Sequence, residues 1–240
     1  MEKLKQFLEE NKDARILDVG TGRGNFIAIL DHLNKDYQEI IGIDIFEPAI
    51  SVASKFFEKN KKVKILNADI NNNNFKDEAF DIVCLSNSLH HLEDISLTFK
   101  SMERLVKPGG YLLFNEMMKD NLNDKQISHK LLHHFSAKLD RESGMFHGET
   151  YNRNEIVDLI KKESSFLVKD FWNMATPQEA EATDEQIKNF AKTVDVLLGR
   201  LNPDLQKKYK EEAGNIKKYI LYNGVEGCTQ LLLVAKNNKN

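Results

Sequence analysis

Residues 16–26 read Ile16-Leu17-Asp18-Val19-Gly20-Thr21-Gly22-Arg23-Gly24-Asn25-Phe26. A short β-rich run, Arg15–Val19, leads into three glycines, and apolar residues at helical spacing follow over Asn25–Leu33. Glycines allow positive φ and let a ligand touch the backbone, and the unpaired amides at a helix start favour an anionic group. The segment therefore predicts a strand, a ligand-binding turn and a helix.

The first half of the chain repeats this alternation of strand and helix. Further strands are predicted at Glu39–Ile45, Lys62–Leu66, Phe80–Ser86 and Tyr111–Asn115, and helices at Pro48–Phe57 and around Phe99, Met102 and Val106. Strands that alternate with helices imply a parallel sheet covered on both faces. Ligands bind such sheets at the carboxyl ends of the strands, so we expect the chemistry in the loops that follow them.

The second half is richer in helical patterns. Phe166–Trp172 and Cys228–Ala235 predict two more strands, with helical patterns on both sides of Asn202-Pro203 between them. We interpret 117–150 and 176–221 as helical cap segments within a single domain that spans 1–240. The alternative is that these helices pack on the flank of the sheet.

Composition narrows the class of protein. The 240 residues are 41% hydrophobic and 30% charged, which is typical of a globular protein, and the net charge of −3 disfavours a nucleic-acid partner. The apolar runs are strand-sized, so no membrane span is expected. Cys84 and Cys228 lie among apolar residues, and Met1–Lys5 lacks the apolar core of a secretory signal. We therefore expect a cytoplasmic protein with two buried free thiols.

The glycine spacing separates two kinds of nucleotide site. A dinucleotide fingerprint that starts at Gly20 needs its third glycine at position 25, which is Asn25. The observed pattern resembles motif I of the class I S-adenosylmethionine (SAM) methyltransferases, D-x-G-x-G-x-G, with Asp18, Gly20, Gly22 and Gly24 at its positions. A nicotinamide oxidoreductase is disfavoured for this reason.

Four more segments resemble the same family in the family's order. They are Ile41-Gly42-Ile43-Asp44, Asn67-Ala68-Asp69-Ile70, the motif IV-like run Phe80–Leu92, and the Lys-Pro-Gly-Gly passage within Leu105–Leu112. The resemblance covers about residues 15–116. It implies an α/β, Rossmann-like, doubly wound sheet of seven strands with an antiparallel last strand, to which the helical cap insertion is added.

The resemblance also implies a cofactor and its site. SAM would be bound and S-adenosylhomocysteine (SAH) released, with Asp44 on the ribose hydroxyls and Asp69 on the adenine amino group. The predicted cofactor-binding residues are Asp18, Gly20, Thr21, Gly22, Gly24, Asp44, Ile45, Asp69, Ile70, Ser86 and Asn87.

The implied activity is in-line methyl transfer to a small-molecule acceptor. Methylases of nucleic-acid amino groups usually carry a P-P-Y/W-like motif after the fourth strand, where this chain has Leu85-Ser86-Asn87-Ser88. We predict no nucleic-acid and no membrane partner, and the oligomeric state, monomer or homodimer, is left open. A relative that binds SAM without methyl transfer is the alternative.

Histidines and strand-end residues supply the remaining candidates. His91 and His147 are candidate general bases, and Glu116 and Tyr151 are candidate substrate contacts. His129 and His133 lie four residues apart on one predicted helix face, a spacing that could hold a metal. No cysteine or H-E-x-x-H pattern supports that reading, so a solvated helix face or a polar cavity wall is favoured and no metal site is predicted.

Overall fold

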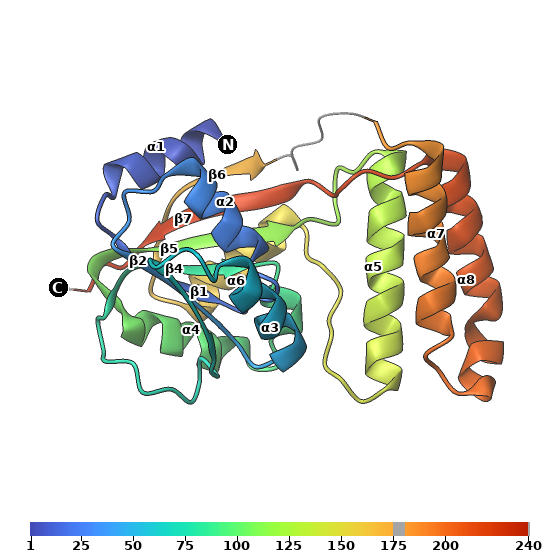
Figure 1. Ribbon diagram of the computed structural model, residues 1–240, viewed down its shortest axis with the longest axis horizontal. Coiled ribbons are helices and arrows are strands. Elements are labelled where there is room, and N and C mark those ends of the chain that lie inside the picture. The colour runs from blue at the N-terminus through green and yellow to red at the C-terminus, as the bar shows by residue number, and fades with distance from the viewer. Residues whose placement is uncertain (175–180, 240) are drawn as a thin grey trace.

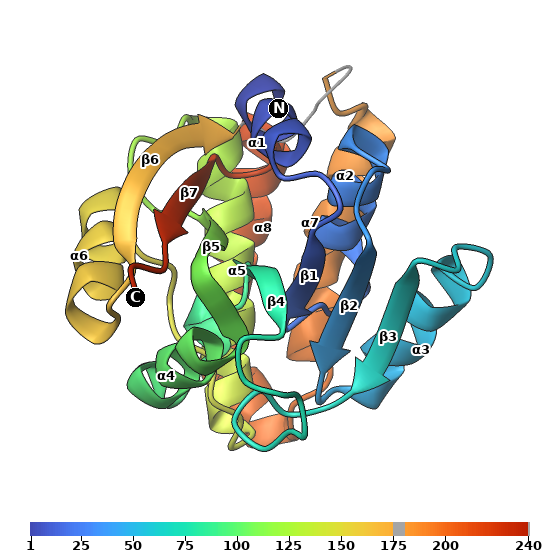
Figure 2. The same cartoon turned by 90° about the vertical axis from the view of Figure 1, so that its left-hand side faces the viewer.

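A single seven-stranded sheet forms the centre of the protein in the computed structural model, which describes residues 1–174 and 181–239 (Figures 1 and 2). The strands are β1 Arg15–Val19, β2 Glu39–Asp44, β3 Val63–Asn67, β4 Phe80–Ser86, β5 Val106–Met117, β6 Leu167–Met174 and β7 Gln230–Lys236. Their order across the sheet is β3-β2-β1-β4-β5-β7-β6. The order reverses between β1 and β4, and a cleft for ligands is expected at that point.

Strand direction confirms the predicted topology. β1 pairs in parallel with β2 and β4, and β4 pairs in parallel with β5. β7 is antiparallel to both of its neighbours, with Phe114 opposite Leu233 and Phe171 opposite the same residue. The last strand alone therefore runs against the other six.

Helices cover both faces of the sheet (Figure 2). One face packs against α1 Glu2–Glu10, α2 Asn25–Leu33 and the C-terminal end of α3 Glu47–Phe56, and the other against α4 Ile95–Leu105 and α6 Arg153–Glu163. β4 explains this arrangement, since Phe80, Ile82, Val83, Cys84 and Leu85 are all fully buried. A strand that is apolar on both sides needs a layer on each face.

Three helices form a separate bundle beyond the carboxyl ends of the strands (Figure 1). They are α5 Asp124–Glu142, α7 Asp184–Leu198 and α8 Pro203–Asn223. Leu132, Phe135 and Leu139 of α5 join Val194 and Ile220 in an apolar core distinct from the two cores that flank the sheet. The bundle occupies the two segments predicted as caps, although Thr176–Ala180 of the second lies outside the described residues. No helix of the described residues is long and apolar enough to cross a membrane.

Two elements differ from the sequence expectations. α1 was not predicted, yet its Leu4 and Leu8 are buried against the sheet. β5 begins at Val106 rather than Tyr111, because Val106 already pairs with Phe80 before a shift in register. The Lys107-Pro108-Gly109-Gly110 passage therefore lies inside the strand as an irregularity, with Gly109 at φ +74°.

Candidate active site

The glycine turn after β1 uses its three glycines in two ways. All three have positive φ, at +66° for Gly20, +53° for Gly22 and +84° for Gly24. A Cβ on Gly20 would lie 2.5 Å from the Ser88 hydroxyl, and one on Gly24 would lie 2.6 Å from the Phe57 ring. A Cβ on Gly22 would meet nothing within 4 Å. Gly20 and Gly24 thus permit close packing, whereas Gly22 leaves open space over the backbone.

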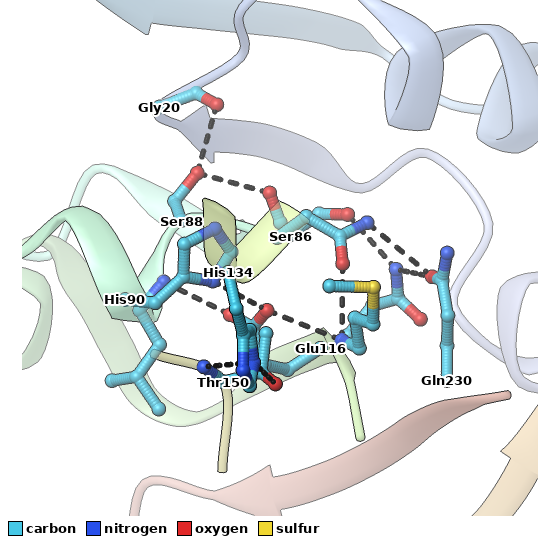
Figure 3. Close-up of polar contacts among 12 residues, drawn as sticks. Gly20, Ser86, Ser88, His90, Glu116, His134, Thr150 and Gln230 are labelled. Carbon is cyan, nitrogen blue, oxygen red and sulfur yellow. Dashed lines mark hydrogen bonds and ion pairs between the residues drawn. The ribbon is translucent and has the colours of Figure 1, made fainter. Parts of the chain in front are cut away.

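Ser88 connects this turn to the end of β4. Its hydroxyl donates to the Gly20 and Ser86 carbonyl oxygens, over 3.1 and 2.9 Å (Figure 3). Asn87 has a φ of +47°, and its side-chain oxygen accepts the Met117 amide at 3.0 Å. These bonds hold the carboxyl ends of β1, β4 and β5 in a fixed relation.

A cavity of about 1420 Å³ lies at these strand ends. Its wall includes nine of the residues predicted for the site: Gly20, Gly22, Asp44, Ile45, Asp69, Ile70, Asn87, His91 and His147. Six others do not line it: Asp18, Thr21, Gly24, Ser86, Glu116 and Tyr151. Ile45 and Phe46 stay 72% and 62% exposed, and such apolar surface on a cavity wall suits the flat face of a ligand.

Asp44 orders the glycine turn through its carboxylate. One oxygen accepts the Gly22 amide and the other accepts the Phe46 amide, both at 2.8 Å. Asp69 makes a similar local bond, accepting the Asn71 amide at 2.8 Å. Each carboxylate oxygen has a second lone pair, so both side chains can still accept hydrogen bonds from a ligand.

Asp18 lies beneath the turn and is 1% exposed. Neither of its carboxylate oxygens has a hydrogen-bond partner among the described residues. Burial, together with the nearby negative charge of Asp44, raises the pKa of Asp18 to about 7. The residue supports the turn from below and does not reach the cavity.

We predict that the stability of an Asp18→Asn variant responds to pH differently from that of the parent protein. An acid whose pKa is raised in the folded state stabilises the fold at low pH, and this stabilisation is lost as the pH rises from about 4 to about 7. The free energy of unfolding of the parent should fall by about 2–3 kcal/mol relative to the variant between pH 5 and pH 8. Urea unfolding of both proteins at the two pH values measures this, and an unchanged difference would contradict it.

A buried histidine–carboxylate pair lies behind the wall of the cavity. His90, in the short helical turn η1 Leu89–His91, lies with its Nδ1 2.9 Å from Glu116 at the end of β5, and the two side chains are 2% and 0% exposed (Figure 3). Glu116 also accepts the Leu89 and Met117 amides at 3.0 and 3.1 Å. The predicted substrate contact Glu116 therefore lies under His90 rather than on the cavity wall.

Further histidines gather around His90. His91 is on the cavity wall, and His147 lies there with its Nδ1 2.6 Å from Asp140. His133 of α5 contributes a third ring, 4.7 Å from that of His90 between centroids. Desolvation, with the neighbouring histidines, lowers the pKa of His133 to about 2 and also lowers those of His91 and His147. These rings are therefore neutral at pH 7.

The candidates Tyr151 and His129, and Arg153 beside Tyr151, have other surroundings. Tyr151 forms a β-bridge with Met118 and packs against the core. Arg153 donates its amide to Asp120 over 3.2 Å and its side chain to Asn173, so both residues tie the start of α6 to the strand ends. The Nδ1 of His129 accepts the Cys228 amide at 3.1 Å, away from the histidine group of the cavity.

Comparisons with known proteins agree with this architecture. Residues 17–114 match the family model described as a methyltransferase domain. This region matches the methyltransferase domain family, and the sheet around it has the corresponding fold. The matched region contains the glycine turn, Asp44, Asp69 and the His90 turn.

Individual relatives extend the likeness over different shares of this chain. A SAM-dependent methyltransferase structure from Methanosarcina mazei superimposes with a TM-score of 0.59 over 95% of this chain and 94% of that one, at 19% identity. The demethylmenaquinone methyltransferase of Bacillus licheniformis is 29% identical over 47% of this chain and 48% of its own length. A highly reducing polyketide synthase of Alternaria alternata is 31% identical over 50% of this chain but only 5% of its own length. The chain therefore spans half or less of these curated relatives.

Proposed function

We propose that this protein transfers the methyl group of SAM to a small-molecule acceptor bound in the 1420 Å³ cavity. The observation that carries the proposal is the continuity of this cavity. Its lining includes Gly22, Asp44 and Ile45 from the turns after β1 and β2, and also His91 of η1, Asp140 of α5 and His147 of the loop after α5. A cofactor and an acceptor could therefore lie in the same space.

The residues present suit SAM. The open space over Gly22 allows a ligand against the backbone, and Asp44 and Asp69 offer acceptors for ribose hydroxyls and an adenine amino group. Ile45 and Ile70 provide apolar surface beside them. When bound, SAM supplies an activated methyl group, so the protein chiefly has to align the acceptor and exclude water.

The acceptor side of the cavity belongs to α5 and the loop after it. Met145 and Phe146, 56% and 49% exposed, line it together with His147. Exposed apolar side chains on a cavity wall favour an acceptor with apolar surface. His91 and His147 are in position to take a proton where the acceptor must lose one. The demethylmenaquinone methyltransferase among the relatives makes quinone-like rings a useful first class to test.

Two assays separate the alternatives. Calorimetric titration should show binding of SAM and SAH and none of NAD. Consumption of SAM in the presence of a small-molecule library should then reveal methyl transfer. Binding of SAH without turnover of any acceptor would favour a non-catalytic SAM-binding protein, and binding of NAD alone would overturn the proposal.

We also propose a cytoplasmic location, which Cys84 and Cys228 support because both are buried as free thiols. Such thiols are typical of reducing compartments.

Asp44→Ala provides a residue-level test of the cofactor site. The substitution removes charge-assisted hydrogen bonds, worth about 1.5–3 kcal/mol, so affinity for SAH should fall roughly 10- to 150-fold. Asp77→Ala is a suitable control, because Asp77 is an exposed acid paired with Arg104. Equal SAH affinity in the two folded variants would show that Asp44 does not bind the cofactor.

A further inference from the structure

Three histidines from separate segments present one ring nitrogen each to a common point. They are His90 of the η1 turn, His133 of α5 and His147 of the following loop, and these nitrogens all lie within 4.8 Å of one another. The ring centroids of His133 and His147 are 5.1 Å apart, and those of His90 and His147 are 5.4 Å apart. Residues up to 57 positions apart in the sequence are thus brought to one place by the docking of α5 against the strand ends.

Two ring nitrogens of these three histidines have no hydrogen-bond partner in the part of the chain that the structure describes. They are Nε2 of His133 and Nε2 of His147, and both atoms are buried. A buried polar atom without a partner costs about 1–3 kcal/mol, and a bound ion or water is the usual explanation. Two such atoms within one cluster indicate a ligand shared by them.

Two of the three rings, those of His90 and His147, are oriented by carboxylates. Nδ1 of His90 donates to Glu116 over 2.9 Å, and Nδ1 of His147 donates to Asp140 over 2.6 Å. With the proton on Nδ1, the Nε2 lone pair of each ring is free to bind a cation. Metal-binding histidines are typically oriented in this way, by a carboxylate that accepts from the second ring nitrogen.

We propose that His90, His133 and His147 bind a divalent transition-metal ion of the zinc type through neutral imidazole nitrogens. Zn–N bonds of 2.0–2.1 Å place three tetrahedral ligands about 3.3 Å apart, so modest rotation of the rings would complete the site. Glu116 and Asp140 balance the charge of the ion. We expected no metal site from the sequence. There, His133 was considered together with His129 and not with His90.

The position of the ion indicates its use, and this step rests on the proposed function. His147 and Asp140 both line the cavity, whereas His90 and His133 are not part of its wall, so the ion would adjoin the acceptor side and its fourth coordination position would be the one open to an acceptor. An acceptor oxygen or nitrogen bound there would be polarised and would lose its proton more readily. His91, which is not one of the three ligands, keeps the role of candidate base.

Zinc binding tests the site without any acceptor. Protein stripped with a chelator and titrated with zinc sulfate should bind one ion per chain, and X-ray absorption should show three imidazoles at 2.0–2.1 Å. His133→Asn and His147→Asn should each weaken zinc binding at least 100-fold. Glu116→Gln should weaken it roughly 10- to 100-fold, because it loosens the orientation of His90.

His32→Ala is the matched control, since it removes an imidazole of α2 that lies outside the cluster. Its zinc affinity should equal that of the parent. Circular dichroism shows whether each variant is folded, and titration of SAH into the folded variants tests the cofactor proposal separately. Absence of stoichiometric zinc binding, or zinc retained by a folded His133→Asn/His147→Asn double variant, would overturn the metal site, whereas loss of SAH binding alone would overturn only the proposed function.

Discussion

Gly22→Val should reduce SAH affinity roughly 100- to 1000-fold. The valine side chain would enter the open space over the turn, where a Cβ meets no protein atom within 4 Å, and would occupy the volume that the cofactor needs. Overpacking against the cofactor costs about 1–3 kcal/mol. A β-branched residue at a φ of +53° is strained by about 1–2 kcal/mol, and a free turn that relieves this strain by leaving the ligand-binding conformation must recover it when SAH binds. Isothermal titration with SAH measures the loss.

Gly109→Val separates ligand exclusion from backbone strain. Gly109 has a φ of +74°, and a Cβ there would meet no atom closer than 4.0 Å, but the residue lies at the amino end of β5 and away from the cavity. We expect this variant to be less stable than the parent and to bind SAH with nearly normal affinity. A comparable loss of affinity in both variants would show that strain, and not the occupied space, explains the effect at Gly22.

Removal of the inserted helices should abolish methyl transfer while SAH binding stays within a few-fold of the parent. The variant replaces 176–221 with a short Gly/Ser linker. Gly22, Asp44 and Asp69 belong to the strand ends and remain, whereas the acceptor side loses the support that α7 and α8 give to α5. Pocket closure excludes water and completes an acceptor site, so activity is the property expected to disappear.

The deletion variant needs further changes on α5 so that the protein stays soluble. Leu132, Phe135 and Leu139 would be uncovered by the deletion, and their replacement by Gln in the same chain prevents aggregation through that face. A chain with only the three Gln replacements serves as the control for the loss of the bundle core. Methyl transfer that survives the deletion would refute the role of the helices in the acceptor site. Loss of SAH binding in a variant whose sheet is intact would show that the cofactor site also depends on these helices.

Local patterns predicted the sheet well because its strands are buried. β1 and β4 have the predicted bounds, since apolar runs and flanking glycines mark a strand that is covered on both faces. α1 was missed because only Leu4 and Leu8 of its nine residues are buried, and the remaining polar side chains resemble an exposed end of the chain. The Lys-Pro-Gly-Gly passage was assigned to a turn because nothing in it shows that Val106 pairs with Phe80.

The site required information that depends on tertiary contacts. Glu116 lies at the end of β5 and His90 follows the neighbouring β4, and the register of Ser86 opposite Asn115 brings them together. The strand order could therefore have predicted that Glu116 and His90 lie close together. No local pattern predicts the approach of His133 to His90, because it depends on the angle at which α5 docks. That angle is set by packing against side chains of α7 and α8, which lie between Ala191 and Ile220.

α5 has two faces that must keep their alignment. His133 of the histidine cluster and Asp140 of the cavity wall lie two turns apart on one face, while Leu132, Phe135 and Leu139 face the bundle. One inserted or deleted residue between 133 and 140 would rotate everything after it by about 100°, which would separate Asp140 from His147 and expose Leu139 in the same step. Changes of length in this region of related proteins should therefore fall before Asn123 or after Glu142, and acceptor preference should vary by substitution on α5 at constant length.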